Sequence, residues 1–204
     1  MTEKIQRHLA KDPILAPLLT TELTPVKTDN HVFEALIRAI VFQQLSGKAA
    51  KTIHTRFVDL LPNNQVTPEH ILSCTFDDLR AVGLSRQKVG YVQNVAAYFQ
   101  ENMPNPSAIN WQKMDDETII KDFTSIKGVG EWTVQMLLIF TLNRPNILPT
   151  KDLAIQQAIQ TLYGLGDLKG KKLMNAMEEV AAPWAPYRSY ATRLLWKWRD
   201  TIVR

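Results

Sequence analysis

The chain has 204 residues, of which 45% are hydrophobic and 22% charged, the balance of a globular protein that can bury a core of its own. Its net charge of +4 suits a polyanionic partner without requiring one. Its single cysteine, Cys74, excludes intramolecular disulfides, a four-cysteine zinc site and an all-cysteine iron–sulfur cluster, and it favours a reducing, intracellular compartment.

Neither a targeting segment nor a membrane span is expected. The N-terminal residues MTEKIQRHLAKD are charged and lack the apolar core of a signal peptide. Apolar runs such as Met136 to Phe140 are far too short to cross a bilayer. We therefore expect a protein that is not secreted, and that is cytoplasmic in a bacterium or nuclear in a eukaryote.

The predicted fold class is all-α. Apolar residues recur at helical spacing, and no stretch shows sustained strand alternation. The expected helices cover residues 31–44, 48–61, a short segment from 68, 77–82, 86–101, 115–124, 129–142, 153–163, 168–180 and 187–203. We expect these helices to form two lobes with a cleft between them, one over about 45–142 and the other combining 1–44 with 143–204.

A glycine-containing hairpin is the sharpest local signal. The segment Ser125 to Thr133 reads SIKGVGEWT and lies between two amphipathic helices. Gly128 and Gly130 permit positive φ and close approach of a bulky group, and the amides around Val129 would face an anion at the start of the next helix. A DNA phosphate is the natural ligand, with Lys127 and Thr133 as further contacts. The alternative is an ordinary tight turn between helices.

Several ordered motifs resemble those of the helix-hairpin-helix/Gly-Pro-Asp family of DNA glycosylases. Past a proline-containing loop, the hairpin is followed by Pro149-Thr150-Lys151-Asp152 at the start of a helix. The segment QQLSGKAA, residues 43–50, and the segment PYRSYA, residues 186–191, with Trp196 beyond it, resemble the alkylbase subfamily, of the DNA-3-methyladenine glycosylase II type. The chain looks like the minimal helical form of that type, without the N-terminal β-rich domain of its best-known member.

The resemblance implies base excision repair of DNA, with Asp152 as the catalytic carboxylate. A carboxylate can stabilise the positive charge on the sugar in the transition state and orient the attacking water. Asp is also a favoured helix N-cap, so Asp152 could serve only as a cap, or serve both purposes. We expect a monomer that acts on double-stranded DNA containing alkylated bases and that binds no membrane.

Trp132 stands where bifunctional relatives carry the lysine that forms a Schiff base, so the resemblance implies a monofunctional glycosylase without lyase activity. Trp132 could line the base pocket or pack in the core, because it shares a helical stripe with Met136. Trp196 lies on the polar face of the last helix, which favours a place in the cleft. Gln44 is a polar side chain on an apolar stripe and could bond a flipped base. Met136 stands where the subfamily's well-known member has tyrosine.

The turn after Gly83 matches the segment from which relatives insert a side chain into the gap left by the flipped base. Leu84 and Arg86 are the candidates for this wedge, and a capped helix start with solvated charges is the alternative. The sequence indicates no metal site and no cofactor, apart from a monovalent cation that the hairpin carbonyls could hold. No role is expected for the four histidines.

The sequence also allows two other functions. A non-catalytic DNA-damage-binding protein would keep the fold and lose turnover, and the intact Asp152 argues against it. A purely structural helical domain would use its G-V-G only as a turn, and the ordered set of motifs argues against that. Release of alkylated purines from DNA would separate all three functions.

Overall fold

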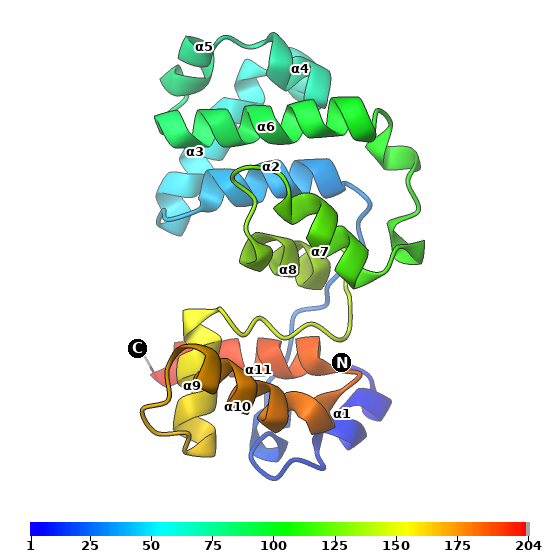
Figure 1. The fold of residues 1–204 in the computed structure, drawn as a ribbon, viewed down its shortest axis with the longest axis vertical. Coiled ribbons are helices and arrows are strands. Elements are labelled where there is room, and N and C mark those ends of the chain that lie inside the picture. Colours follow the sequence, from blue (N-terminus) through cyan, green and yellow to red (C-terminus); the bar gives the residue numbers. More distant parts are fainter. Residues whose placement is uncertain (203–204) are drawn as a thin grey trace. The chain divides into compact units, whose positions relative to one another are not determined.

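The computed structural model describes residues 1–202 and is helical throughout, with no β-strand in that range (Figure 1). The α-helices are α1 (Glu3–Leu9), α2 (Val32–Phe42), α3 (Gly47–Leu60), α4 (Pro68–Ser73), α5 (Phe76–Ala81), α6 (Arg86–Asn102), α7 (Asp116–Thr124), α8 (Glu131–Phe140), α9 (Leu153–Tyr163), α10 (Gly170–Ala181) and α11 (Arg188–Ile202). Short 3₁₀ helices are η1 (Ala16–Thr20), η2 (Pro62–Asn64), η3 (Pro106–Ala108), η4 (Trp111–Lys113) and η5 (Ala182–Trp184).

The all-α prediction is confirmed, and every predicted helix is present. Side-chain caps explain many of the starts, because Ser46, Thr67, Thr75, Ser85 and Asp115 each accept a backbone N–H at the beginning of a helix. Helix α1 was not predicted, since its seven residues bury only Ile5 and Leu9. The predicted end of the last helix at Val203 lies outside the described residues.

The chain divides into two compact units, and the division differs from the predicted one. The hairpin unit comprises residues 28–137, and the terminal unit comprises 1–27 together with 138–204. The prediction placed residues 1–44 in one lobe, but α2 packs against α3 and α6 and so belongs to the hairpin unit. Its stripe of Phe33, Leu36 and Ile40 is fully buried there.

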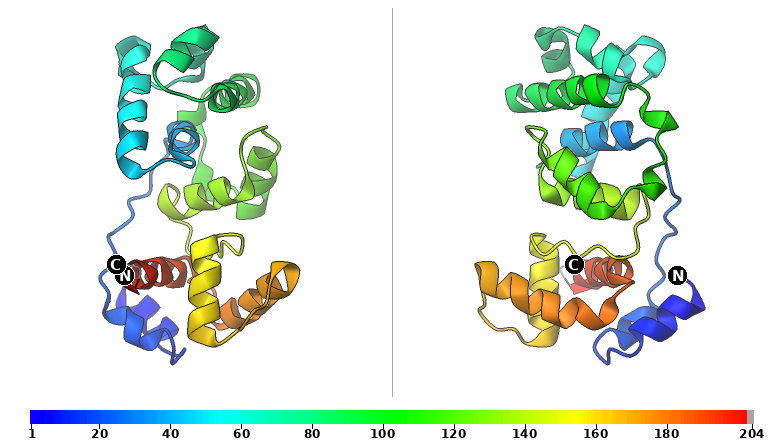
Figure 2. Two further views of the ribbon diagram at one scale, coloured as in Figure 1. Left: turned by 90° about the vertical axis from the view of Figure 1, so that its left-hand side faces the viewer. Right: turned by 45° about the vertical axis from the view of Figure 1, so that its right-hand side comes forward.

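Helix α6 is the central element of the hairpin unit. It packs on α2 and α4 and touches α5, while α3 lies along α2. The left view of Figure 2 looks nearly along α2 and α6, with α3 beside them. Beneath α6 an aromatic cluster joins Phe99 with Phe33, Trp111 and Phe123, with ring centroids 5.1–6.5 Å apart. The buried cluster fixes α7, and with it the hairpin that follows α7.

The terminal unit is built on α9, which packs against α10 and α11, while η1 also contacts α11 (Figure 1). Its core combines residues from both ends of the chain, among them Leu9, Leu15, Ile159, Met177 and Leu194. No helix among residues 1–202 has both the length and the apolar character that crossing a bilayer requires.

Asp12 ties the N-terminal segment to the rest of the terminal unit. Its Oδ1 accepts the backbone N–H groups of Ile14 and Leu15, at 2.9 and 3.2 Å. Its Oδ2 accepts the Tyr163 hydroxyl at 2.7 Å and the Trp184 indole N–H at 2.8 Å. Burial alone would raise the pKa of Asp12, but the four hydrogen bonds together hold that pKa below its ordinary value.

We predict that Asp12→Asn destabilises the protein by about 1–3 kcal/mol at pH 7. The amide has one acceptor oxygen, so either the side-chain donors Tyr163 and Trp184 or the N–H groups of Ile14 and Leu15 lose their acceptor. A lowered pKa means that the carboxylate stabilises the fold above the unfolded value of about 3.9, and that this stabilisation disappears as pH falls through the folded pKa. The difference between variant and wild type should therefore narrow from pH 7 to pH 3 in urea unfolding. A difference that stays constant over this range would contradict the assignment.

Candidate active site

Asp152 begins α9 as its N-cap and is nearly buried, with 9% of its surface exposed. Its Oδ1 accepts the backbone N–H of Ile155 at 2.9 Å. The same oxygen accepts the indole N–H of Trp196 at 3.1 Å. Asp152 is thus a helix cap, as one reading of the sequence proposed, and it is also fixed by a tryptophan from a distant part of the chain.

Trp196 lies on α11 and is partly buried against the core of the terminal unit. Its ring stacks on Phe140, with centroids 5.6 Å apart and planes inclined by 27°. Phe140 itself is 47% exposed. The two rings therefore form one aromatic surface, and the indole N–H of Trp196 donates to Asp152. Helical periodicity in the sequence could not indicate this hydrogen bond.

The polar face of α11 is buried. The position of Trp196 on this face was therefore the wrong reason for placing it in a cleft. The Ser189 hydroxyl accepts the N–H of Ile147 at 2.9 Å, and the Thr192 hydroxyl donates to the carbonyl of Ile147 at 3.5 Å. Arg193 donates to the carbonyl of Thr24. This face is polar because it binds backbone of the proline-containing loop and of the N-terminal segment. Trp196 continues the same stripe and binds Asp152.

The hairpin between α7 and α8 is shaped by α6. Gly128 has φ +106°, and a Cβ placed there would lie 2.2 Å from Cγ of Tyr91. The carbonyl of Lys127 accepts the side-chain amide of Asn94 at 3.0 Å. The N–H of Val129 donates to the carbonyl of Ile126 at 3.0 Å, so this amide closes the turn and does not point outward as predicted.

Gly130, by contrast, has no atom within 4 Å of its ideal Cβ position and is exposed. Its carbonyl accepts the N–H of Val134 at 3.2 Å, the first bond of α8. The N–H groups of the first turn are not used by the helix itself, and the helix dipole makes this end attractive to an anion. An external group can therefore approach at Gly130, whereas Gly128 is required by the fold.

Trp132 and Met136 follow on α8 one turn apart. Trp132 is 42% exposed and Met136 is partly exposed, so this stripe of α8 is not the core stripe that the sequence also allowed. Thr133 is 3% exposed, and its hydroxyl accepts the side-chain amide of Gln43 at 3.4 Å. The Thr133 hydroxyl is therefore buried against Gln43 and cannot make the predicted DNA contact.

Gln44 is not on the apolar stripe of α2. Helix α2 ends at Phe42, and Gln44 is exposed with φ +54°. At this end of the helix the Lys88 ammonium donates to the carbonyls of Val41 and Gln43, each at 2.7 Å. Burial lowers the pKa of Lys88, which is the cost of placing an ammonium between two backbone carbonyls. Gln44 is accordingly presented on a turn fixed by α6.

Of the two wedge candidates, Leu84 is fully buried, because it packs in the core at the start of α6. Arg86 is exposed, with its guanidinium 6.0 Å from the centre of the Phe76 ring. The prediction of Leu84 is therefore corrected. Leu45, which sequence reasoning passed over, is 38% exposed on the turn between α2 and α3. Its apolar character beside the polar neighbours Gln44 and Ser46 was the signal that could have identified it.

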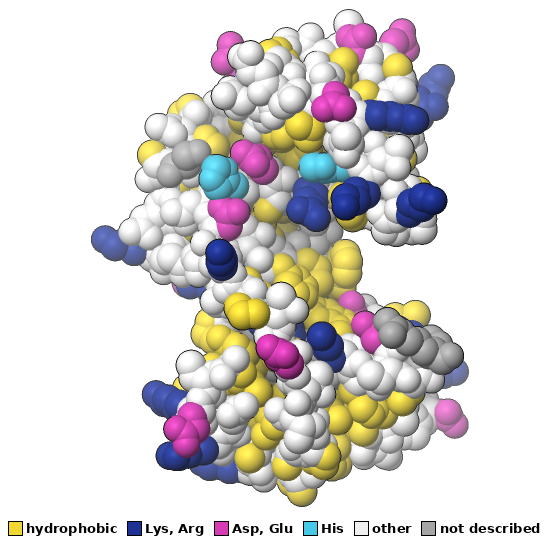
Figure 3. Space-filling view, turned by 180° about the vertical axis from the view of Figure 1, so that it is seen from behind, with side chains coloured by type: hydrophobic (Ala, Val, Ile, Leu, Met, Phe, Trp, Pro, Cys, Tyr) yellow, Lys and Arg dark blue, Asp and Glu magenta, His cyan; other side chains and the backbone are white. Residues whose placement is uncertain are grey.

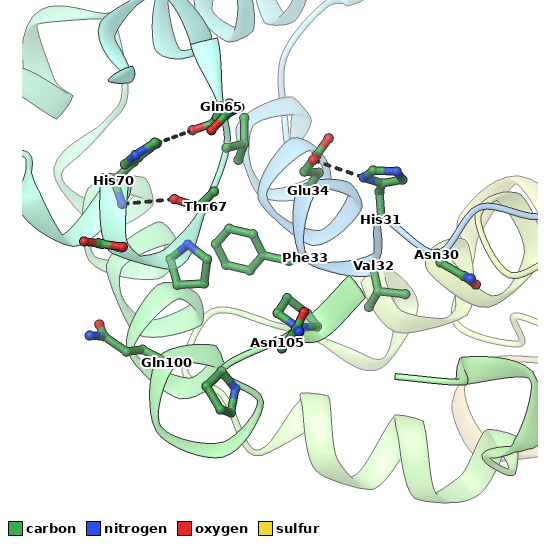
Figure 4. A pocket seen from close by; sticks show the side chains of 15 residues that line it. Asn30, His31, Val32, Phe33, Glu34, Gln65, Thr67, His70, Gln100 and Asn105 are labelled. Carbon is green, nitrogen blue, oxygen red and sulfur yellow. Dashed lines mark hydrogen bonds and ion pairs between the residues drawn. The ribbon is translucent and has the colours of Figure 1, made fainter. Parts of the chain in front are cut away.

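A hollow of about 600 Å³ lies elsewhere in the hairpin unit (Figure 4). It is lined by the start of α2, residues 65–70 and the chain after α6, and His31 and His70 reach its rim. None of the predicted site residues lines it. Within residues 1–202, no group of three or more histidine, cysteine, aspartate or glutamate side chains could hold a metal ion.

The predicted site residues therefore fall in two sets. Asp152 and Trp196 are brought together in the terminal unit, beside Phe140. Trp132, Met136, Gln44 and the hairpin belong to the other unit. That both sets line one cleft stays a prediction.

Comparison with known proteins assigns the segment that contains the hairpin and Asp152 to a family. Residues 37–183, a stretch that contains both, match the model of the HhH-GPD superfamily of base excision DNA repair proteins. The chain belongs to this superfamily. The DNA-3-methyladenine glycosylase 1 of Schizosaccharomyces pombe is 37% identical over 166 residues, which are 81% of this chain and 71% of that protein.

Solved structures of HhH-GPD proteins agree with the fold. The crystal structure of a DNA-3-methyladenine glycosidase from Bacillus halodurans gives a TM-score of 0.79 at 30% identity, covering 99% of this chain and 91% of that one. The Schizosaccharomyces pombe 3-methyladenine DNA glycosylase in complex with abasic DNA gives 0.75 at 31% identity, covering 94% and 95%. Family membership confirms the resemblance inferred from the hairpin and Asp152, and Trp196 lies beyond the matched residues.

The two hairpin glycines of this HhH-GPD protein should respond differently to a methyl group. Gly128→Ala should lower the free energy of unfolding by about 1–3 kcal/mol, because the added Cβ meets the Tyr91 ring and φ at this position is unfavourable for alanine. Gly130→Ala should stay within about 1 kcal/mol of wild type because the position is open. Thermal unfolding of both variants checks this, and equal losses would contradict the geometry.

Proposed function

We propose that this chain is a monofunctional DNA glycosylase that hydrolyses the bond between an alkylated purine and its deoxyribose in double-stranded DNA. The observation that carries the proposal is the Asp152 carboxylate in an HhH-GPD protein, held by the Ile155 N–H and the Trp196 indole. Its products would be a free alkylated base and an abasic site. The relatives named DNA-3-methyladenine glycosylase support this substrate class.

The reaction needs a negative charge near the sugar. As the glycosidic bond breaks, positive charge develops on the deoxyribose ring, and a fixed carboxylate stabilises that charge without having to reorganise. Asp152 is held in place by donors from two helices, α9 and α11, both of which bond Oδ1. Asp152 would also orient or deprotonate the water that attacks the sugar.

The lesion must leave the base stack to reach Asp152, so we propose that the target nucleotide is flipped out of the duplex. Alkylation at a ring nitrogen, as in 3-methyladenine or 7-methylguanine, makes the purine cationic and weakens its glycosidic bond. The exposed faces of Trp132 and of the Trp196–Phe140 pair would attract such a cation by about 0.5–2 kcal/mol per well-placed ring. Cationic purines are therefore the preferred lesions.

DNA would be held by its phosphate backbone at Gly130 and the first turn of α8. Such a contact positions the duplex and reads no sequence, which suits an enzyme that searches for rare lesions. For the wedge, we propose Leu45 or Arg86 in place of the buried Leu84. Apolar wedges are common between base steps, and Leu45 is exposed on a turn that Lys88 holds in place.

Asp152→Asn should lower the rate of base release by at least about 100-fold while leaving duplex binding nearly unchanged. The amide oxygen of Asn can still accept both N–H groups, so α9 and Trp196 keep their positions and only the negative charge is lost. Single-turnover release of 7-methylguanine from alkylated DNA measures this.

The matched control is Asp167→Asn, which removes the same charge from an exposed loop of the terminal unit and should change nothing. Retention of most of the activity by Asp152→Asn would refute the role proposed for Asp152. So would a loss of activity that is fully explained by unfolding.

Borohydride should trap no covalent adduct between this protein and DNA containing a lesion or an abasic site. Trp132 has no amine, so no Schiff base can form at the position where bifunctional relatives carry lysine. Denaturing gels detect such adducts, with a bifunctional glycosylase as the positive control. A stable cross-link would contradict monofunctional chemistry and would identify another amine as the nucleophile.

A further inference from the structure

Three cations of the hairpin unit lie outside every site described so far. Arg38 is on α2, and Lys48 and Lys51 are on α3, and all three side chains are exposed. We call these residues the basic face. Figure 3 shows Lys and Arg side chains gathered beside a histidine on the side of the molecule that this view presents.

The Phe42 ring links Arg38 of α2 to α3. The Arg38 guanidinium lies 5.1 Å from the centre of the Phe42 ring, and His54 of α3 meets the same ring edge-on at 5.9 Å. Burial and the nearby positive charge of Arg38 lower the pKa of His54, although Glu34 opposes this. These contacts join α2 to α3 at this point and fix the guanidinium of Arg38 against a ring.

Glu34 lies one turn before Arg38 on α2, and its carboxylate pairs with His31 at 3.2 Å. Within the part of the chain that the structure describes, Arg38, Lys48 and Lys51 form no ion pair. Lys48 stands in the first turn of α3, which contains no acidic residue, so its charge opposes the positive end of the helix dipole. The repulsion between the Lys48 ammonium and the positive end of the helix dipole would be reduced when an external anion binds there.

The basic face is continuous with the turn that we propose contacts DNA. Phe42 ends α2 immediately before the turn, and Lys48 follows the cap Ser46 by two residues. Helix α6 holds this turn through Lys88 and supports the hairpin through Tyr91. The basic face, the turn and the hairpin all belong to one compact unit.

We infer that Arg38, Lys48 and Lys51 bind backbone phosphates of duplex DNA, as a second contact in addition to the hairpin at Gly130. Cations on a helix face with no acidic partner fit a polyanion and carry no sequence information. The inference rests on the proposed function in one respect, namely that the ligand is duplex DNA.

The experiment compares two double variants of the full chain. Arg38→Gln with Lys51→Gln removes two cations of the basic face. Arg56→Gln with Lys113→Gln removes the same charge from exposed positions of the same unit. Arg56 follows Lys51 by five residues and Lys48 by eight, so around α3 it lies about 140° from the first and about 80° from the second. Affinity for an undamaged duplex is measured over a range of salt concentrations, and thermal unfolding checks that all proteins are folded.

The basic-face variant should lose about 10- to 100-fold in affinity near 0.1 M salt, and its plot of log affinity against log salt should be shallower by about 2. The control variant should keep the wild-type slope. Equal slopes for the two variants would overturn the inference, and so would an unchanged affinity of the basic-face variant. Undamaged DNA keeps the test independent of excision: a wild type that released no base but showed the slope difference would refute the proposed function and leave the inference standing.

Discussion

The arrangement of the terminal unit depends on one oxygen atom, Oδ1 of Asp152. The Ile155 N–H bonds it from the first turn of α9, and the Trp196 indole N–H bonds it from α11. The first bond starts a helix, and the second is the last member of a stripe through which α11 holds the proline-containing loop at Ile147. A carboxylate fixed from both sides can stabilise charge without first losing conformational freedom. The proline-containing loop, the N-cap bond and Trp196 therefore together fix the position of the Asp152 carboxylate.

In the hairpin unit the corresponding support is a single face of α6. Lys88, Tyr91 and Asn94 follow one another at about one-turn spacing. Lys88 binds two carbonyls at the end of α2, Tyr91 packs closely on Gly128, and Asn94 binds the carbonyl of Lys127. The hairpin therefore owes its shape less to its own side chains than to a neighbouring helix. Two loops that are far apart in the sequence are positioned by one rigid element, so their spacing is preserved when either loop changes.

Periodicity and capping residues were enough to locate every α-helix except α1, because most helices bury an apolar stripe and begin at a side-chain acceptor. The ordered set of motifs, with the hairpin, Asp152 and residues 43–50 and 186–191, indicated the family. What failed had a common cause. Gln44 was placed on the apolar stripe of the preceding helix, and Leu84 and Thr133 were assigned from their place in a motif. Their exposure depends instead on the end of α2, on the core and on Gln43. The contacts of Gln43 with Lys88 and with Thr133 join residues 45 and 90 positions apart, and no local pattern records them. The polar stripe of α11 misled for the same reason, since its partner is backbone rather than water.

The terminal unit is discontinuous in sequence, and this determines the order in which the two units can fold during synthesis on a ribosome. The Oδ2 atom of Asp12 finds its partners at Tyr163 and Trp184, after the whole hairpin unit has been synthesised. The hairpin unit has all its residues available by position 137 and can fold first, as domains generally do during synthesis. The N-terminal 27 residues must wait unpaired until α9 and η5 emerge, and closing so long a loop is slow. The Asp152 carboxylate receives its second donor only when Trp196 of α11 has been synthesised.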